Sequence, residues 1–282
     1  MAKGLHLLFG GNSRLQPSAQ HIDAHVVKAG PRNARCAPIL LLALSLSPHF
    51  AQASDSATAP AHPGSPAIVV GFVGGFVHAD DQRHSEVQLV NKLRIRHAAG
   101  LYSQVFDNRH RKDAHRAILQ WLDTDGDGNL SEAEKAASRI ILFGHSWGGA
   151  AVISLARELQ QENISVLLTI QVDSITKIGQ NDRMVPANVA KAVNFYQTHG
   201  FLHGRSKIAP ADPLRTQILG EFRLNYDELP AECNNYPWAD RHLFKGHTAI
   251  ECDPQVWSRI ETLIESSLAE DAQRLADKAP LH

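Results

Sequence analysis

The sequence has almost no net charge, few cysteines and no apolar run long enough to cross a bilayer. Its 282 residues include 28 Lys and Arg and 29 Asp and Glu, for a formal net charge of -1. Because no long basic run is present either, nucleic acid is not expected as the main partner. A bilayer span needs about eighteen consecutive apolar residues, so we expect no stable membrane span after processing. The sequence also contains no internal repeat.

The N-terminal part differs in composition from the rest of the chain. Basic residues precede the apolar run 37–46, and a small-x-small pattern follows at 51–53. This order is typical of a secretory signal peptide, here residues 1–53 with an unusually long n-region; a buried helix or a membrane anchor is the alternative. Residues 54–66 are rich in Ser, Ala and Pro and are expected to be a disordered lead-in. We therefore expect a secreted or periplasmic protein whose folded domain spans 67–282.

The small number of cysteines limits the possible disulfides to one. The chain has three cysteines, and cleavage of the predicted signal peptide removes Cys36. Cys233 and Cys252 remain, and an even pair in an oxidising compartment suggests a disulfide. Two buried thiols are the alternative.

Short apolar runs alternate along the chain with stretches whose apolar residues recur at helical spacing. The apolar fraction is 43%, enough for one large core in a chain of this length. Because strands that alternate with helices form parallel sheets covered on both faces, we expect a single α/β domain. The predicted strands are 67–73, 101–106, 140–143, 165–172 and 190–196, and the predicted helices lie near 87–93, 114–122, 152–159 and 254–264.

The strand predicted at 140–143 leads into the turn 144–149, Gly-His-Ser-Trp-Gly-Gly, and a helical pattern follows. A Gly-x-Ser-x-Gly between strand and helix is typical of a nucleophile elbow. Its strained turn projects the serine hydroxyl from the edge of the sheet, and the next helix points its N-terminus at that hydroxyl. Gly144 and Gly148 let the strand and helix backbones approach closely. We therefore expect Ser146 to be a nucleophile; a glycine-rich turn without a catalytic role is the alternative.

A serine nucleophile needs a base to take its proton and an acid to orient that base. Asp173 follows the first strand after the elbow helix, at the sheet edge where catalytic groups gather. His247 is expected in a loop just before the terminal helix, from which it can return to the same edge. We therefore predict His247 as the general base and Asp173 as its orienting acid.

Other residues compete for these two roles. Asp182 and Asp212 are alternative acids if the acid follows a later strand, and His242 and His145 are alternative bases. His145 precedes the nucleophile on the elbow, which favours a packing or orienting role. Two further histidines, His199 and His203, are candidates for lining a pocket or for exposed positions.

The tetrahedral intermediate of acyl transfer needs hydrogen-bond donors for its oxyanion. One predicted donor is the backbone N–H of Trp147, the residue after the nucleophile. The other is expected from the loop after the first strand, at Gly74 and Gly75, which lead into Phe76. A tight turn without a catalytic role is the alternative for this loop.

By these residues, above all the run 144–149, the chain resembles the α/β-hydrolase superfamily in its lipase and esterase-like branch, over most of 67–268. The resemblance implies a mostly parallel sheet with helices on both faces, a three-layer sandwich, and hydrolysis of carboxylic esters through an acyl-enzyme. In that family, an acid placed like Asp173 is a known variant of the more usual later position. The chain is small and has few residues for a large lid, which weighs against long-chain lipids. A small ester or lipid-like substrate is expected, and the same triad would serve thioesters or amides.

The acidic segment 123–134 matches the EF-hand calcium loop. Acids stand at loop positions 1, 3, 5 and 12, glycine at position 6 provides the turn, and serine stands at position 9, where a water often intervenes. Only one such loop exists, and it directly precedes the elbow strand, so we expect a structural Ca²⁺ clip rather than a sensor. A solvated acidic loop is the alternative, and a non-catalytic calcium-binding module on a hydrolase scaffold is the rival function. The predicted ligands are Asp123, Asp125, Asp127, Asn129 and Glu134.

Overall fold

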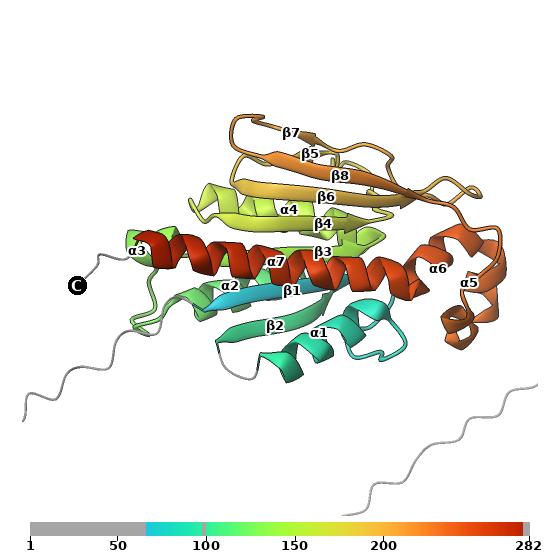
Figure 1. The fold of residues 1–282 in the computed structure, drawn as a ribbon, viewed down its shortest axis with the longest axis horizontal. Helices are drawn as coiled ribbons and strands as arrows, with labels where there is room; N and C mark the ends of the chain where they lie inside the picture. Colours follow the sequence, from blue (N-terminus) through green and yellow to red (C-terminus); the bar gives the residue numbers. More distant parts are fainter. Residues whose placement is uncertain (1–65, 98–99, 279–282) are drawn as a thin grey trace, which may run out of the picture. The chain divides into compact units, whose positions relative to one another are not determined.

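A parallel sheet of six strands, in the order β2-β1-β3-β4-β6-β8, forms the centre of the domain (Figure 1). The computed structural model describes residues 66–97 and 100–278, so the predicted signal peptide and the lead-in up to residue 65 lie outside the described residues. All neighbouring strands of this sheet are parallel. The strands are β1 Ala67–Val73, β2 Leu101–Asp107, β3 Arg139–His145, β4 Val166–Val172, β6 Val189–Gln197 and β8 Gln217–Leu224.

Helices cover both faces of the sheet. One apolar cluster packs α1 (Ser85–Arg96), α6 (Lys245–Cys252) and α7 (Pro254–Lys278) on one face. A second cluster packs α2 (Arg111–Leu122) and α4 (Trp147–Gln161) on the other. Each buried strand supplies side chains to both clusters in turn, which explains its continuous apolar run. The three-layer α/β fold expected from the sequence is therefore confirmed. Within the described part of the chain, no helix combines the length and the apolar character that a bilayer crossing requires.

The edge strand β8 and several short elements were not predicted from the sequence, whereas α7 was predicted at 254–264. The edge strand β8 contains no buried residue, so it lacks the apolar run by which a central strand is recognised. Two short strands, β5 (Met184–Val185) and β7 (Ala209–Pro210), form a separate parallel pair. The remaining short helices are α3 Glu132–Ala136, the 3₁₀ helix η1 Ala231–Asn235 and α5 Trp238–Leu243.

The carboxyl ends of the central strands meet at one edge of the sheet. His145 at the end of β3 is level with Val172 at the end of β4, and Val172 is level with Phe195 on β6. The residues that follow β3 and β4, Ser146 and Asp173, are consequently held side by side by backbone pairing alone. Catalytic groups in open parallel sheets gather at this edge.

A disulfide joins Cys233 and Cys252, 19 residues apart, with a Cα–Cα distance of 5.3 Å. Cys233 lies in η1 and Cys252 is the last residue of α6. The bond therefore fixes η1 to α6, the helix that carries His247, rather than a loop to the terminal helix.

Reducing this disulfide is expected to lower the thermal stability and the activity together. Closing a loop of this size contributes roughly 3 kcal/mol in the chain-entropy model, which corresponds to roughly 6 to 12 °C in Tm for a domain of this size. Melting curves with and without reductant measure the change. The double variant Cys233→Ala/Cys252→Ala is the control, because its curve should not respond to reductant. Two titratable thiols in the native protein would contradict the bond.

Candidate active site

Ser146 lies on a strained turn between β3 and α4. Its backbone has φ 57° and ψ -126°, in the left-handed region that residues with a Cβ rarely adopt. Its N–H donates to the carbonyl of Val172 on the neighbouring strand, at 2.9 Å. A Cβ on Gly148 would overlap the carbonyl oxygen of Phe72, and one on Gly144 would come within 2.6 Å of the Gly148 backbone. The close strand–helix approach that the glycines predicted is therefore present.

His247 and Asp173 form a buried pair at the same edge. Nδ1 of His247 lies 2.7 Å from Oδ2 of Asp173, and both side chains are almost completely buried. The sequence predicted His247 in a loop, which is wrong: it lies in the first turns of α6. Gly246 lets this helix pack closely against Gln197. A Cβ at position 246 would lie 2.5 Å from Oε1 of Gln197.

Three further hydrogen bonds hold the carboxylate of Asp173. Nε2 of Gln197 donates to Oδ2 at 2.8 Å, while the backbone N–H groups of Gly204 and Gln197 donate to Oδ1 at 2.6 and 3.3 Å. Burial opposes ionisation of Asp173, but the hydrogen bond and charge of His247 and the bond from Gln197 outweigh it and hold the pKa below its usual value. Gln197 and Gly204 were not predicted from the sequence. The position of Gln197 could have indicated its role, because it directly follows the strand predicted at 190–196. That strand is the next one along the chain after the strand that ends before Asp173.

Ser146 and His247 both line a cavity of about 550 Å³. Because Nδ1 of His247 is bonded to Asp173, the nitrogen left for a proton from serine is Nε2. Among the described residues no hydrogen bond joins the serine hydroxyl to His247, and in free enzymes such catalytic bonds often close only with substrate bound. Much of the cavity wall is apolar, with Phe76, Trp147, Leu202 and Phe244 among its residues.

The predicted oxyanion residues lie against the nucleophile. A Cβ on Gly74 would be 2.9 Å from Cβ of Ser146, so only glycine lets this loop pass so close. Trp147 is the first residue of α4, and a first-turn N–H has no acceptor within its own helix. Gly75 has φ 46°, and the next side chain, Phe76, packs edge-on against the Trp147 ring at 5.3 Å between centroids. Gly74, Gly75 and Trp147 are thus brought together at Ser146.

His145, an alternative base in the sequence, packs behind His247. Its ring centroid is 4.4 Å from that of His247, and only 3% of its surface is exposed. Burial lowers the pKa of His145 to about 4, although the charge of Glu251 opposes the shift. A neutral ring in this position supports the base rather than replacing it.

The alternative acids are engaged elsewhere. Asp182 is buried, accepts a hydrogen bond from the Ser174 hydroxyl at 2.6 Å and pairs with Arg205. Asp212 accepts from the backbone of Leu214 in the turn before β8. Neither bonds to His247 in the described part of the structure.

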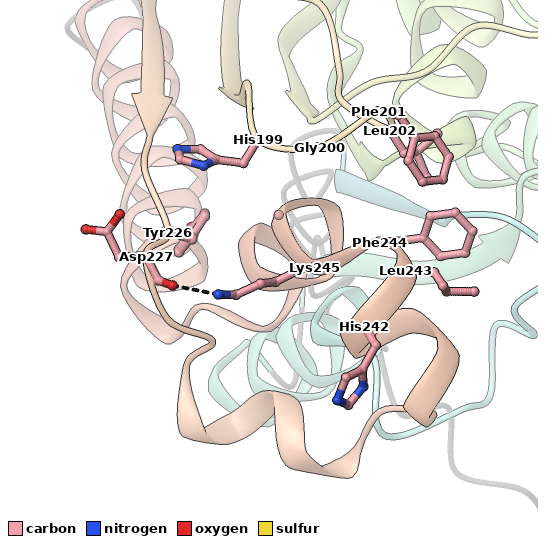
Figure 2. A pocket seen from close by; sticks show the side chains of 11 residues that line it. His199, Gly200, Phe201, Leu202, Tyr226, Asp227, His242, Leu243, Phe244 and Lys245 are labelled. Carbon is pink, nitrogen blue, oxygen red and sulfur yellow. Dashed lines mark hydrogen bonds between the residues drawn. The ribbon is translucent and has the colours of Figure 1, made fainter.

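The remaining candidate histidines lie outside the cavity that Ser146 lines. His199 and His242 line a neighbouring cavity of about 360 Å³ (Figure 2), and Nδ1 of His242 lies 2.9 Å from the carbonyl oxygen of Trp238. His203 lines another depression on the surface, together with Ser174. These histidines are therefore not positioned to act on Ser146.

The acidic loop 123–134 runs from the end of α2 into the first turn of α3, before the start of β3, whereas Ser146 follows the end of β3. Carboxylate oxygens of Asp123, Asp125 and Glu134 lie within 4.8 Å of one another. Asp127 and Asn129 belong to the same loop but not to this group of three. The structure thus brings three of the five predicted calcium ligands together.

No family model matches the chain, and no curated protein matches it in sequence. Among solved structures, an arylesterase is 14% identical with a TM-score of 0.41, covering 72% of this chain and 76% of its own. A dienelactone hydrolase from Anabaena variabilis is 12% identical with a TM-score of 0.37, covering 73% and 87%. A dienelactone hydrolase-like promiscuous phosphotriesterase from metagenomic libraries is 15% identical with a TM-score of 0.37, covering 72% and 87%. All three are hydrolases by name.

Proposed function

We propose that this protein is an exported serine hydrolase that cleaves carboxylic esters through an acyl-enzyme on Ser146. The observation that carries the proposal is the buried His247–Asp173 pair, with Nδ1 and Oδ2 2.7 Å apart, in a cavity that Ser146 also lines from a strained turn. This combination serves nucleophilic catalysis. Export rests on the N-terminal pattern at 1–53.

In the proposed reaction, the hydroxyl oxygen of Ser146 attacks the ester carbonyl while Nε2 of His247 takes the hydroxyl proton. Asp173 holds the ring in the required tautomer and stabilises the imidazolium. The N–H of Trp147 and the backbone of Gly74 and Gly75 are the donors for the oxyanion. His247 then protonates the leaving alcohol, and a water activated by the same base hydrolyses the acyl-enzyme.

The cavity favours small substrates with an apolar part. Its volume of about 550 Å³ is in the range of pockets that hold one small molecule. Its aromatic and aliphatic wall suits an acyl or alcohol group without charge. The triad itself does not distinguish an ester from a thioester or amide, and an activity panel over these classes would.

Covalent labelling of the folded protein with a fluorophosphonate tests the proposal. We expect one label per chain, located on Ser146 by peptide mapping, and no label on Ser146→Ala. Ser154→Ala is the matched control, because this serine lies on the same helix and its hydroxyl bonds to the Ala150 carbonyl at 2.9 Å. A folded wild-type protein that takes no label would favour the rival function, a non-catalytic calcium-binding module.

We also propose that loop 123–134 binds Ca²⁺ as a structural ion. The donor set fits, because oxygens of Asp123, Asp125 and Glu134 lie within 4.8 Å of one another and Ca²⁺ prefers oxygen ligands. Gly128, at the turn position of the loop, has φ 82°. The carboxylate of Glu134 accepts hydrogen bonds from Thr124, at the start of the loop, and from Ser131, near its end. The carboxylate of Glu134, the strongest predicted ligand, therefore lies between the two ends of the loop.

Calcium is expected to raise the melting temperature. Without a cation the clustered carboxylates repel one another, so binding favours the folded loop. Free Ca²⁺ at a hundred times its Kd would add roughly 2.7 kcal/mol, or several degrees in Tm. Mg²⁺ is expected to do less, because the ligand number suits the larger ion. Glu134→Gln should remove most of the shift, while the exposed neighbour Glu132→Gln should keep it. Identical melting curves in chelator and in millimolar Ca²⁺ would contradict calcium binding.

A further inference from the structure

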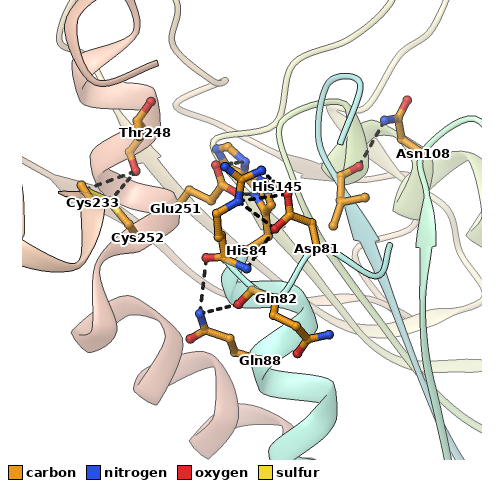
Figure 3. A network of polar contacts seen from close by, with 12 residues as sticks. Asp81, Gln82, His84, Gln88, Asn108, His145, Cys233, Thr248, Glu251 and Cys252 are labelled. Carbon is orange, nitrogen blue, oxygen red and sulfur yellow. Dashed lines mark hydrogen bonds and ion pairs between the residues drawn. A yellow bond between two sulfur atoms is a disulfide. The ribbon is translucent and has the colours of Figure 1, made fainter. Parts of the chain in front are cut away.

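A second group of ionisable side chains lies beside the proposed base and takes no part in the proposed reaction. His84 is the N-cap of α1, Glu86 lies in the first turn of that helix, and Glu251 lies on α6, one helical turn after His247. All three are buried, and one ligand atom from each lies within 4.8 Å of the others. Figure 3 shows His84 and Glu251 together with His145 between the start of α1 and α6.

Several polar atoms of this group have no partner in the described part of the chain. Glu86 is 0% exposed, and neither of its carboxylate oxygens has a hydrogen-bond partner. Nε2 of His145 is also buried without a partner. Buried polar groups are normally hydrogen-bonded, and an unpaired buried carboxylate is especially unfavourable. The free oxygens of Glu86 therefore need a cation or a proton.

Glu251 also contacts the histidines on both sides of it. Nδ1 of His84 contacts Oε1 of Glu251 directly, and Oε2 of Glu251 lies 3.5 Å from Nδ1 of His145. Ligand atoms of a tetrahedral zinc site are roughly 3.3 Å apart, given metal–ligand distances of about 2.0 to 2.1 Å. Nε2 of His84 lies 3.7 Å from Oδ2 of Asp81, and metal-binding histidines commonly place their second nitrogen toward a carboxylate in this way.

We propose that His84, Glu86 and Glu251 bind a divalent transition-metal ion, with Zn²⁺ as the first candidate and His145 as the available fourth ligand. Imidazole together with carboxylates suits Zn²⁺, whereas Ca²⁺ and Mg²⁺ prefer oxygen alone. The two carboxylates balance the charge of the ion. On binding, the ion takes the place of the proton between His84 and Glu251 and of the proton that the buried Glu86 carboxyl carries without a metal, and both protons leave to solvent.

The ion would fix the start of α1 to α6. Because Glu251 follows His247 by one turn of that helix, the site would hold the base in position without taking part in the reaction. The proposal stands apart from the proposed hydrolase activity, since metal uptake can be measured without any substrate. It also differs from the loop 123–134, whose ligands are all oxygens.

Metal binding to the untagged full chain tests the proposal. After dialysis against a chelator, the protein is titrated with Zn²⁺ against a chromogenic chelator, and bound metal is counted by mass spectrometry. We expect one equivalent of Zn²⁺ and a higher Tm. Glu86→Gln and Glu251→Gln, which keep the side-chain shape, should each weaken binding roughly tenfold to a hundredfold or more. The matched controls are Glu228→Gln, an exposed glutamate, and Glu134→Gln in the acidic loop; both should bind Zn²⁺ as the wild type does.

Three results would overturn the proposal. The first is a folded wild-type chain that takes up no Zn²⁺, Co²⁺ or Mn²⁺ at micromolar concentration, because protons then satisfy the cluster. The second is wild-type affinity in Glu86→Gln, which would place the ion elsewhere. If that variant does not fold, the Co²⁺ complex of the wild-type chain is measured instead. Binding of one equivalent of Co²⁺, with a visible absorption band that persists in excess Ca²⁺, would support the site. Displacement of the bound Co²⁺ by Ca²⁺ would be the third contrary result.

Discussion

Ser146→Ala is expected to lower kcat for a small chromogenic ester on the order of 10⁶-fold, to the level left by binding and the oxyanion donors alone. The reason is geometric. The strained turn, with φ 57° at Ser146, holds the serine hydroxyl at the edge of the sheet. The next residue is the first of α4, and Gly74 packs so closely that a Cβ there would lie 2.9 Å from Cβ of Ser146. The alanine side chain fits wherever the serine Cβ fits, so the fold should be unchanged and only the nucleophile lost.

The measurement is initial rate against ester concentration, at equal concentrations of folded protein. Ser154→Ala controls for loss of a hydroxyl on the same helix and should keep wild-type kcat and KM. Turnover by Ser146→Ala close to that of the wild type would show that another group carries the acyl transfer, and the triad assignment would then be wrong.

The nucleophile turn could be predicted because its determinants are contiguous. The run 144–149 contains the strand end, the strained position and the small residues that the strand–helix contact requires. In the structure a Cβ on Gly148 would overlap Phe72 on β1. The glycine is therefore required by a contact with another strand, and the local sequence pattern indicates that contact. The central strands were predictable for a similar reason, since burial on both faces demands an unbroken apolar run.

The surroundings of Asp173 could not be predicted in the same way. Its partners Gln197 and Gly204 are 24 and 31 residues away, and only the parallel pairing of β4 with β6 brings Gln197 to the acid. The helix around His247 was also missed, because its small apolar and polar residues are buried against neighbours from several elements rather than along one stripe. The edge strand β8 lacks the buried apolar residues that mark a central strand.

The two proposed metal sites show the same contrast. The acidic loop 123–134 is found in the sequence because its ligands follow one another at fixed spacing. The buried cluster joins His84 and Glu86 to Glu251, which is 167 residues after His84, and no spacing rule links them. Folding alone places these groups beside His247, whose helix carries Glu251.

Asp173→Asn is expected to lower kcat on the order of 10⁴-fold with the fold retained. In the wild type, Asp173 accepts from Nδ1 of His247 and from Gln197 and Gly204 at once. An asparagine amide has only one acceptor oxygen, and each oxygen of Asp173 accepts from two donors, so two donors must face an NH₂ group. If these are His247 and the side chain of Gln197, the ring takes the wrong tautomer, and if they are the backbone N–H groups of Gly204 and Gln197, the acid site is distorted. The loss should appear in kcat more than in KM, because the imidazolium forms only during the reaction.

Asp182→Asn is the matched control for this prediction. Asp182 is the other buried aspartate named as an alternative acid, but it accepts from Ser174 and pairs with Arg205 rather than with His247. Removing its charge should therefore lower the free energy of unfolding by leaving Arg205 unpaired, while kcat changes little. His247→Ala should approach the loss seen for Ser146→Ala, because members of a triad act as a unit. Wild-type kcat in Asp173→Asn, combined with a large loss in Asp182→Asn or Asp212→Asn, would assign the orienting acid to that other residue.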